Sequence, residues 1–370
     1  MARRSYEIAH VLMTGEPVGG VWGFSLDLAR GLAVHGVRTT LATMGHSPTT
    51  SQVEEAQGVP GLELHHTESR PDTEAAAQWL LALADRVRPD VVHLNGFAHT
   101  SLPWNVPSLV VAHGDAVSRR LAVRPGLAIT PDLHEYKQQV QRGLSSASMV
   151  VSSTLAGLAD LQRNYEVAPP SRAIPIGKSR SEPLGARKRP LVLSAARCWD
   201  ESKNLNVLQQ AARQVEWAVY VAGDLPQDRQ PRMQEVNFLG RLCPGALSAW
   251  FSRASLYALP AKYDPDGLSA LEAALAGCAL VLADIPSLRE LWNGVAIFAP
   301  ADDSAAFAAA IQQFSEDPIR RFDFAGRALE RAQRYSVPAM ACDYLFAYQD
   351  LKQAVGLDLA SAAHPGVSLL

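Results

Sequence analysis

The feature of this chain that most constrains its fold is a regular alternation of short β-rich runs with helical segments. In the first half, strands are expected at residues 7–14, 37–44, 62–67, 91–95, 109–113, 149–153 and 173–176, and helices at 21–35, 72–87, 132–144 and 155–164. Such alternation is typical of parallel sheets, because two neighbouring parallel strands must be joined by a long crossover connection, which is usually a helix. The pattern therefore predicts an α/β fold.

The alternation is interrupted at residues 169–190, a proline-rich, basic stretch without apolar periodicity that we interpret as a linker. It resumes with strands at 191–195, 218–222, 236–239, 255–259, 279–283 and 295–298, and helices at 204–215, 245–252, 268–276, 304–314 and 318–334. A chain of 370 residues also exceeds what one hydrophobic core usually supports. We therefore assign residues 1–178 and 179–336 to two domains, and residues 337–370 to a closing segment.

The composition argues against several classes of protein. Apolar residues make up 48% of the chain, enough for two packed cores, and a net charge of −3 gives no indication of a nucleic-acid partner. No segment has the features of a secretory leader or of a membrane helix. The cysteines are too widely spaced for a zinc or redox motif, so we expect free thiols in the cytoplasm: Cys198, Cys243, Cys278 and Cys342.

The strongest candidate for a binding site is the loop and short helix that follow the fourth strand of the second half. With Asp266 as the helix N-cap, the amides of Gly267 and Leu268 would be free to bind a phosphate. Glu272 is the only charge on an otherwise apolar helix, and a carboxylate there suits a vicinal diol such as ribose. Asp264 would present a second acceptor further along the ligand. The alternative is a surface helix with ordinary charges.

A glycine-rich turn, GEPVGGVWG, follows the first strand. Glycine allows the backbone to approach a ligand closely, and Gly19 and Gly20 would direct amides toward an anion at the start of the next helix. The alternative is a tight turn with no further role. The dinucleotide-binding spacing G-x-G-x-x-G is absent, which argues against a nicotinamide enzyme.

Polar side chains follow other strands as well. His113 ends an apolar strand at the edge where catalytic residues of open α/β sheets collect, or it caps that strand locally. His93 lies in the middle of a strand and is expected to be a core residue. Arg197 and Lys203, at the first strand-to-helix turn of the second domain, would neutralise a diphosphate without a metal, or they are solvated loop cations.

Together these segments resemble the retaining glycosyltransferases of the GT-B fold, family 4 (the group 1 glycosyltransferases). The resemblance spans nearly the whole chain and is carried by PVGGVWGFSLDLARGLAVHGV, PDVVHLN, VVAHGD, IPIG, SAARCWDESKNLNVLQQAA and VNFLGRL. RYSVPAMACDYLFAYQDL is similar to the family's closing helix. The resemblance implies two Rossmann-like domains that face each other across a cleft, with a C-terminal helix that crosses back to the N-terminal domain.

The resemblance also implies roles for the two acids of the candidate segment. The family's signature is Glu, seven residues, then Glu. Glu272 holds the second place and would bind the ribose hydroxyls, whereas Asp264 holds the first and would bind hydroxyls of the donor sugar. Aspartate is one methylene shorter than glutamate, and Pro265 follows where glycine is common, so this contact bears on donor choice.

The other candidates would surround the diphosphate and the reacting carbon. Their implied contacts are the diphosphate for Gly267, Leu268, Arg197 and Lys203, the reacting carbon for His113, and the phosphates and acceptor for Gly19 and Gly20. In the first domain, candidate acceptor contacts are Trp22, Phe24, Trp104, Arg119 and Arg120.

The implied activity is hexosyl transfer (EC 2.4) from a nucleotide-sugar donor, with retention at the anomeric carbon. Such enzymes use the departing phosphate as the base, so we expect no cofactor, no metal and no Asp-x-Asp metal site in the cleft. The acceptor would be a saccharide or glycolipid of cell-envelope polysaccharide synthesis, and the basic linker could rest against an anionic membrane. Two alternatives on the same fold stay open, a non-catalytic nucleotide-sugar-binding protein and a nucleotide-sugar isomerase.

Overall fold

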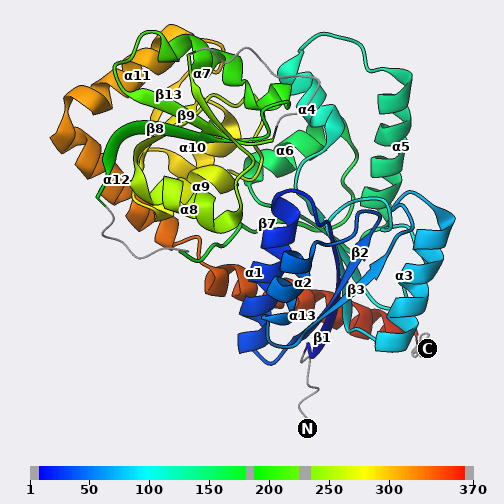
Figure 1. Ribbon diagram of the computed structural model, residues 1–370. Coiled ribbons are helices and arrows are strands. Elements are labelled where there is room, and N and C mark those ends of the chain that lie inside the picture. Colours follow the sequence, from blue (N-terminus) through cyan, green and yellow to red (C-terminus); the bar gives the residue numbers. More distant parts are fainter. Residues whose placement is uncertain (1–7, 181–186, 225–234, 363–370) are drawn as a thin grey trace, which may run out of the picture.

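Two parallel sheets, each with helices on both faces, form the two domains of the molecule (Figure 1). The structure, a computed structural model, describes residues 8–180, 187–224 and 235–362. The predicted α/β architecture is therefore confirmed.

The first domain contains a seven-stranded sheet in the order β3-β2-β1-β4-β5-β6-β7, and every neighbouring pair is parallel. Its strands are β1 (His10–Gly15), β2 (Arg38–Met44), β3 (Leu62–Thr67), β4 (Val91–Leu94), β5 (Ser108–Ala112), β6 (Met149–Ser152) and β7 (Ser171–Ala173). Its helices are α1 (Gly20–Val34), α2 (Thr50–Gln57), α3 (Glu74–Val87), α4 (Ala116–Val123), α5 (Pro131–Ser146) and α6 (Leu155–Asn164). Along β1, Val11 and Met13 belong to the core on one face and Leu12 to the core on the other. Because both faces are covered, every residue of the strand is buried.

The second domain contains a six-stranded parallel sheet in the order β10-β9-β8-β11-β12-β13. Its strands are β8 (Arg189–Ala195), β9 (Ala218–Ala222), β10 (Asn237–Gly240), β11 (Ala254–Leu259), β12 (Ala279–Ala283) and β13 (Ile297–Ala299). Its helices are η1 (Glu201–Lys203), α7 (Leu205–Ala212), α8 (Pro244–Arg253), α9 (Leu268–Leu275), α10 (Pro286–Trp292), α11 (Ser304–Glu316) and α12 (Pro318–Gln333). Leu193 and Val192 on β8 again face two separate cores.

In both sheets the strand order reverses beside the first strand, between β1 and β4 and between β8 and β11. Connections on the two sides of such a point leave toward opposite faces, so a crevice opens at the carboxyl ends of the strands. The turns after β1, β4, β5, β8 and β11 lie at or next to these points, and they carry most of the candidate site residues.

Three short helices, α2, α4 and α10, were not predicted. Only Ala56 of α2 is buried, so the helix has no apolar periodicity, although Thr49 and Gln52 form a capping box at its start. The helices α4 and α10 have 8 and 7 residues, too few for a helical period to stand out.

The linker prediction was partly wrong, because β7 lies within the stretch 169–190 and pairs with β6 at the edge of the first sheet. Residues 181–186 of the predicted linker and 363–370 of the predicted tail lie outside the described residues.

The last helix, α13 (Val337–Ala362), leaves the second domain and packs along α1 of the first (Figure 1). Tyr344 and Tyr348 are fully buried in the core of the first domain. Asp350 pairs with Arg172 on β7. The predicted crossing helix is therefore confirmed. Although α13 has 26 residues, none of the described helices is long and apolar enough to span a membrane.

The contact between α1 and α13 requires a glycine. A Cβ on Gly31 would lie 2.5 Å from Cβ of Ala341 and 3.1 Å from the carbonyl oxygen of Val337. We expect Gly31→Ala to lower the free energy of unfolding by about 1–3 kcal/mol, because the overlap outweighs the gain in helix propensity. Gly326→Ala in α12, where a Cβ meets no atom within 4 Å, is the matched control and should raise it by about 0.5–1 kcal/mol. Urea denaturation measures both, and an equal gain in the two variants would contradict the close approach.

Candidate functional site

The candidate residues border two cavities between the domains. The larger, of about 820 Å³, has among its lining residues Gly19, Gly20, Leu268 and Glu272. The smaller, of about 520 Å³, has among its lining residues His113, Arg197, Lys203 and Asp264. Of the described residues predicted to bind the donor or to act in catalysis, Gly267 alone is a lining residue of neither cavity. The tertiary structure thus divides residues that the sequence analysis treated as one site.

Asp264 was predicted to face the ligand, but its carboxylate has two internal partners. Oδ1 accepts a hydrogen bond from the amide of Gly267 at 3.1 Å, and Oδ2 lies 3.3 Å from Nζ of Lys203. The side chain is only 7% exposed. The expectation that the Gly267 amide is free was therefore wrong. Of the two amides predicted to be free, only that of Leu268 takes part in no hydrogen bond among the described residues, so it can still bind an anion.

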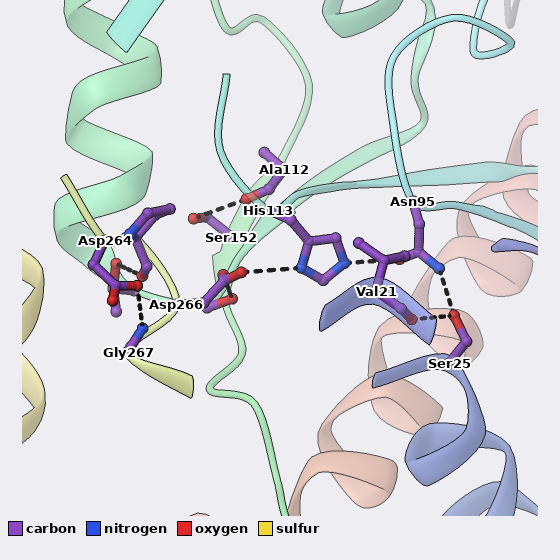
Figure 2. A network of polar contacts seen from close by, with 12 residues as sticks. Val21, Ser25, Asn95, Ala112, His113, Ser152, Asp264, Asp266 and Gly267 are labelled. Atoms are coloured by element: carbon purple, nitrogen blue, oxygen red, sulfur yellow. Dashed lines mark hydrogen bonds and ion pairs between the residues drawn. The ribbon is translucent and has the colours of Figure 1, made fainter. Parts of the chain in front are cut away.

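Asp266 was predicted to cap α9, and this was wrong. The N-cap is Gly267, whose left-handed φ of 61° turns the chain so that Asp266 points toward the first domain. Its Oδ1 accepts a hydrogen bond from Oγ of Ser153 at 2.5 Å, and its Oδ2 lies 3.5 Å from Nδ1 of His113 (Figure 2). Asp266 is therefore a further residue of the site.

No Asp-x-Asp pair was expected in the cleft, yet Asp264-Pro265-Asp266 has this spacing. The structure separates the two carboxylates, because one pairs with Lys203 of the second domain and the other with His113 of the first. Within residues 8–180, 187–224 and 235–362, no group of three or more His, Cys, Asp and Glu side chains could hold a metal ion.

His113 directly follows β5, and its ring is held from two sides. Nε2 lies 2.9 Å from Oδ1 of Asn95, and the ring of Phe24 meets it edge-on with centroids 4.6 Å apart. Gly114, with φ of 123°, allows the turn to approach the second domain, since a Cβ there would lie 3.2 Å from Cγ of Pro265. The His113 side chain is 12% exposed and borders the smaller cavity.

Glu272 extends from α9 toward the larger cavity and meets a cation from the connection between the domains. Its Oε1 lies 3.6 Å from Nζ of Lys178, which also lies 3.0 Å from Oδ2 of Asp27 on α1. Burial raises the pKa of Glu272, and the Lys178 charge only partly opposes the shift. Burial alone would lower the pKa of Lys178, but the two carboxylates raise it overall. Lys178 therefore stays charged and links the two domains.

Arg197 and Lys203 flank the start of η1. The Arg197 side chain is 53% exposed, lies 2.8 Å from Oδ2 of Asp200 and stands over the ring of Trp199. The Lys203 side chain is 16% exposed and pairs with Asp264. Arg197 is thus the more accessible of the two cations.

The glycine-rich turn brings the first domain against α9. Gly19, with φ of 86°, is the N-cap of α1, and a Cβ on Gly20 would lie 3.1 Å from Cδ2 of Leu268. Close domain approach thus accounts for a small residue at position 20, and the phosphate contact stays a prediction.

The candidate acceptor contacts are scattered. Arg119 borders the smaller cavity and Trp22 the larger. Trp22 and Phe24 are nevertheless 6% and 2% exposed, so they mainly pack in the core. Trp104 and Arg120 are lining residues of neither cavity.

Besides Asp266, two residues of the site were missed, Asn95 and Lys178. Asn95 follows β4 at the same sheet edge as His113, so the rule that found His113 would have found it. Lys178 lies in the basic linker, where no periodicity marks it. Lys188 of the linker is engaged within the protein, because its Nζ donates to the backbone carbonyls of Phe251, Ala254 and Ala276.

Known families match both halves of the chain. Residues 18–177 match the sequence model described as Glycosyltransferase Family 4, and residues 189–317 match the one described as Glycosyl transferases group 1. The chain belongs to family 4 of the glycosyltransferases. This glycosyltransferase is 23% identical to a D-inositol 3-phosphate glycosyltransferase of Pseudarthrobacter chlorophenolicus, over 85% of this chain and 86% of the relative. It is 27% identical to a glycogen synthase of Mycobacterium tuberculosis, over 62% of this chain and 61% of the relative.

Solved structures share its architecture. The glycosyltransferase matches sucrose-phosphate synthase from Thermosynechococcus elongatus with a TM-score of 0.76 and 18% identity, over 94% of this chain and 100% of that one. It matches Anabaena Alr3699/HepE, solved in complex with UDP and glucose, with a TM-score of 0.72 and 16% identity. The match covers 96% of this chain and 100% of that one. The predicted GT-B fold is confirmed by these matches.

The raised pKa of Glu272 has a consequence for stability. Because the native state holds this proton more tightly than the unfolded chain, ionisation of Glu272 destabilises the native state as pH rises through the raised pKa. We expect Glu272→Gln to raise the free energy of unfolding at pH 8, and the gain to vanish at acidic pH, where both side chains are neutral. Urea denaturation at several pH values measures this. A gain that does not change with pH would contradict the assignment, and Glu330→Gln on the exposed side of α12 is the control.

Proposed function

We propose that this glycosyltransferase moves a sugar from a nucleotide-sugar to a saccharide or glycolipid acceptor, with retention at the anomeric carbon and without a metal. The observation that carries the proposal is the approach of His113 to Asp266, 3.5 Å apart across the cleft. It brings the carboxyl edges of both sheets to one place, where a donor held by one domain can meet an acceptor held by the other.

The donor side is supported by Glu272 and the N-terminus of α9. The Glu272 carboxylate borders the larger cavity and can accept two hydrogen bonds from a ribose diol once Lys178 releases it. The Leu268 amide at the helix N-terminus favours an anion such as the diphosphate. That a related fold was solved with UDP and glucose agrees with a donor of this class.

The charge of the leaving diphosphate would be met by cations of the protein. Arg197 is exposed at the smaller cavity, and Lys203 is released if Asp264 turns to a donor-sugar hydroxyl. In the proposed step the bond from the anomeric carbon to the phosphate oxygen breaks and a bond to the acceptor oxygen forms on the same face. The acceptor proton moves to the departing phosphate oxygen. Preorganised cations stabilise the charge that develops there.

The acceptor side is supported by the first-domain lining of the smaller cavity. It combines Arg119, Tyr136 and Gln139 with the apolar Met44. Hydrogen-bonding groups beside a small apolar surface suit a saccharide, and the exposed guanidinium of Arg119 would favour an acceptor with an anionic group. A saccharide or glycolipid of the cell envelope fits this description.

The engaged carboxylate of Asp264 favours one alternative, a protein of this fold that binds the nucleotide-sugar without transferring it. A nucleotide-sugar isomerase is the other. Transfer, donor isomerisation and binding without turnover give different products in one assay, so the assay separates all three.

Donor binding is the first test. A nucleotide-sugar that binds only the native state raises the melting temperature, and at a concentration of about 100 Kd it adds about 2.7 kcal/mol of stability. We expect one class among UDP-, GDP-, ADP- and dTDP-sugars to give this shift, and Glu272→Ala to abolish it. Glu330→Ala should keep the full shift. If Glu272→Ala keeps its donor affinity, the ribose assignment is wrong.

Turnover is the second test. We expect EDTA to leave the rate unchanged, and Arg197→Ala to lower kcat about 100-fold, because a preorganised charge at the leaving group is lost. Arg213→Ala, at a residue that lines neither cavity, should retain kcat. NMR of the product should show the anomeric configuration of the donor. Inversion would exclude the proposed front-face step, and loss of activity in EDTA would exclude metal independence.

A further inference from the structure

Asn95 stands at the centre of a polar network beside His113, on the side of the ring opposite to Asp266 (Figure 2). Its Nδ2 donates to the carbonyl oxygen of Thr14 at 2.7 Å and to Oγ of Ser25 at 3.3 Å. The Ser25 hydroxyl donates its own proton to the carbonyl oxygen of Val21 at 2.8 Å, so its oxygen is left to accept. Both partners of Nδ2 are therefore acceptors, and the amide group has one orientation.

Because Nδ2 donates to Thr14 and Ser25, Oδ1 of Asn95 faces two histidines. It lies 2.9 Å from Nε2 of His113 and 3.2 Å from Nε2 of His93. An amide oxygen accepts hydrogen bonds and cannot donate them. Each of these two Nε2 atoms therefore carries a proton.

His93 is consistent with this arrangement from the far side of the network. It is fully buried, and burial lowers its pKa to about 3, so the ring is neutral. With its proton on Nε2, Nδ1 must accept, and the Tyr348 hydroxyl lies 2.6 Å from it. Burial also raises the pKa of Tyr348 well above its usual range, so this hydroxyl keeps its proton to donate. The network thus extends from α13 to the cleft.

The same reasoning leaves Nδ1 as the ring atom of His113 that faces the cleft. Nδ1 lies 3.5 Å from Oδ2 of Asp266, and the edge-on ring of Phe24 holds the imidazole in its plane. We propose that Asn95 is a positioning residue of this glycosyltransferase, which keeps a proton on Nε2 of His113 so that Nδ1 alone meets the substrate. The catalytic consequence rests on the proposed function, whereas the position of the proton does not.

This arrangement gives His113 two defined states. The neutral ring offers a lone pair on Nδ1 to a substrate hydroxyl, which can donate to it in the cleft. A second proton can be added only at Nδ1, where it meets the carboxylate of Asp266 and joins the two domains by an ion pair. Without the Asn95 acceptor, the neutral ring could place its proton on Nδ1 instead and would then present a donor to the substrate.

The position of the proton can be read in the native protein. Long-range ¹H–¹⁵N spectra of the full chain labelled at histidine distinguish the two neutral tautomers, and the His113→Gln spectrum assigns the signal. At a pH where the ring is neutral, we expect His113 to carry its proton on Nε2. A neutral His113 with its proton on Nδ1 would overturn the proposal, and this measurement needs no variant of Asn95.

Variants then test whether Asn95 is the cause. In Asn95→Leu, which has a similar volume and no acceptor, we expect the Nδ1–H tautomer of His113 to appear. In Tyr348→Phe, which removes the far end of the network and leaves Thr14, Ser25 and Asn95 in place, the His113 tautomer should be unchanged. An unchanged tautomer in folded Asn95→Leu would overturn the proposal. If that variant does not fold, the spectrum of the native protein decides.

The kinetic readout separates positioning from a merely structural role. Asn95→Leu should lower kcat at least about tenfold while the donor KM changes less than about twofold. Asn164→Leu, which removes a hydrogen bond to Ser118 away from both cavities, is the matched control and should keep kcat. Equal kcat values in the two variants would overturn the positioning role. If no sugar transfer occurs in the native protein, the proposed function fails, while the NMR result still decides where the proton lies.

Discussion

The return of α13 to the first domain is the constraint on which the site depends. Each parallel sheet is covered on both faces, and the polar groups of the candidate site collect at its carboxyl edge. Two such edges form one site only if they face each other. The helix α13 couples the domains by burying Tyr344 and Tyr348 in the core of the first domain, and its close contact at Gly31 leaves little room for another packing.

Every acid of the candidate site already has a cationic or hydrogen-bonding partner. Glu272 meets Lys178, Asp264 meets Lys203, and Asp266 meets His113. A partly buried carboxylate without a partner would be costly, so these pairs keep the cleft stable before a ligand arrives. A nucleotide-sugar supplies both hydroxyls and a diphosphate. Under the proposed function, its hydroxyls replace the lysines at the carboxylates, and the released cations are then available to the phosphates.

Much of the fold follows from local pattern. The strands β9 and β12 and the helix α6 occur at their predicted residues, because apolar runs mark the strands and Thr154 caps the helix. The helix α2 has no apolar pattern of this kind, since Ala56 is its only buried residue. In the site, His113 was found from its place at a strand end, and Asn95, at the same edge, was within reach of the same rule. Lys178 could not be found, because its partners Asp27 and Glu272 come from two domains.

The sequence by itself determined the order of the strands and of most helices, the two-domain organisation, the family, and the sheet edge at which polar residues would collect. These properties depend on periodicity, turn chemistry and motifs that are read within a few residues. Only the tertiary structure decided what each polar atom meets. A left-handed Gly267 turns Asp266 to His113, and its amide donates to Asp264. The Asn95 amide selects one nitrogen of the His113 ring. Such choices depend on partners far apart in the chain, at distances that no local pattern encodes.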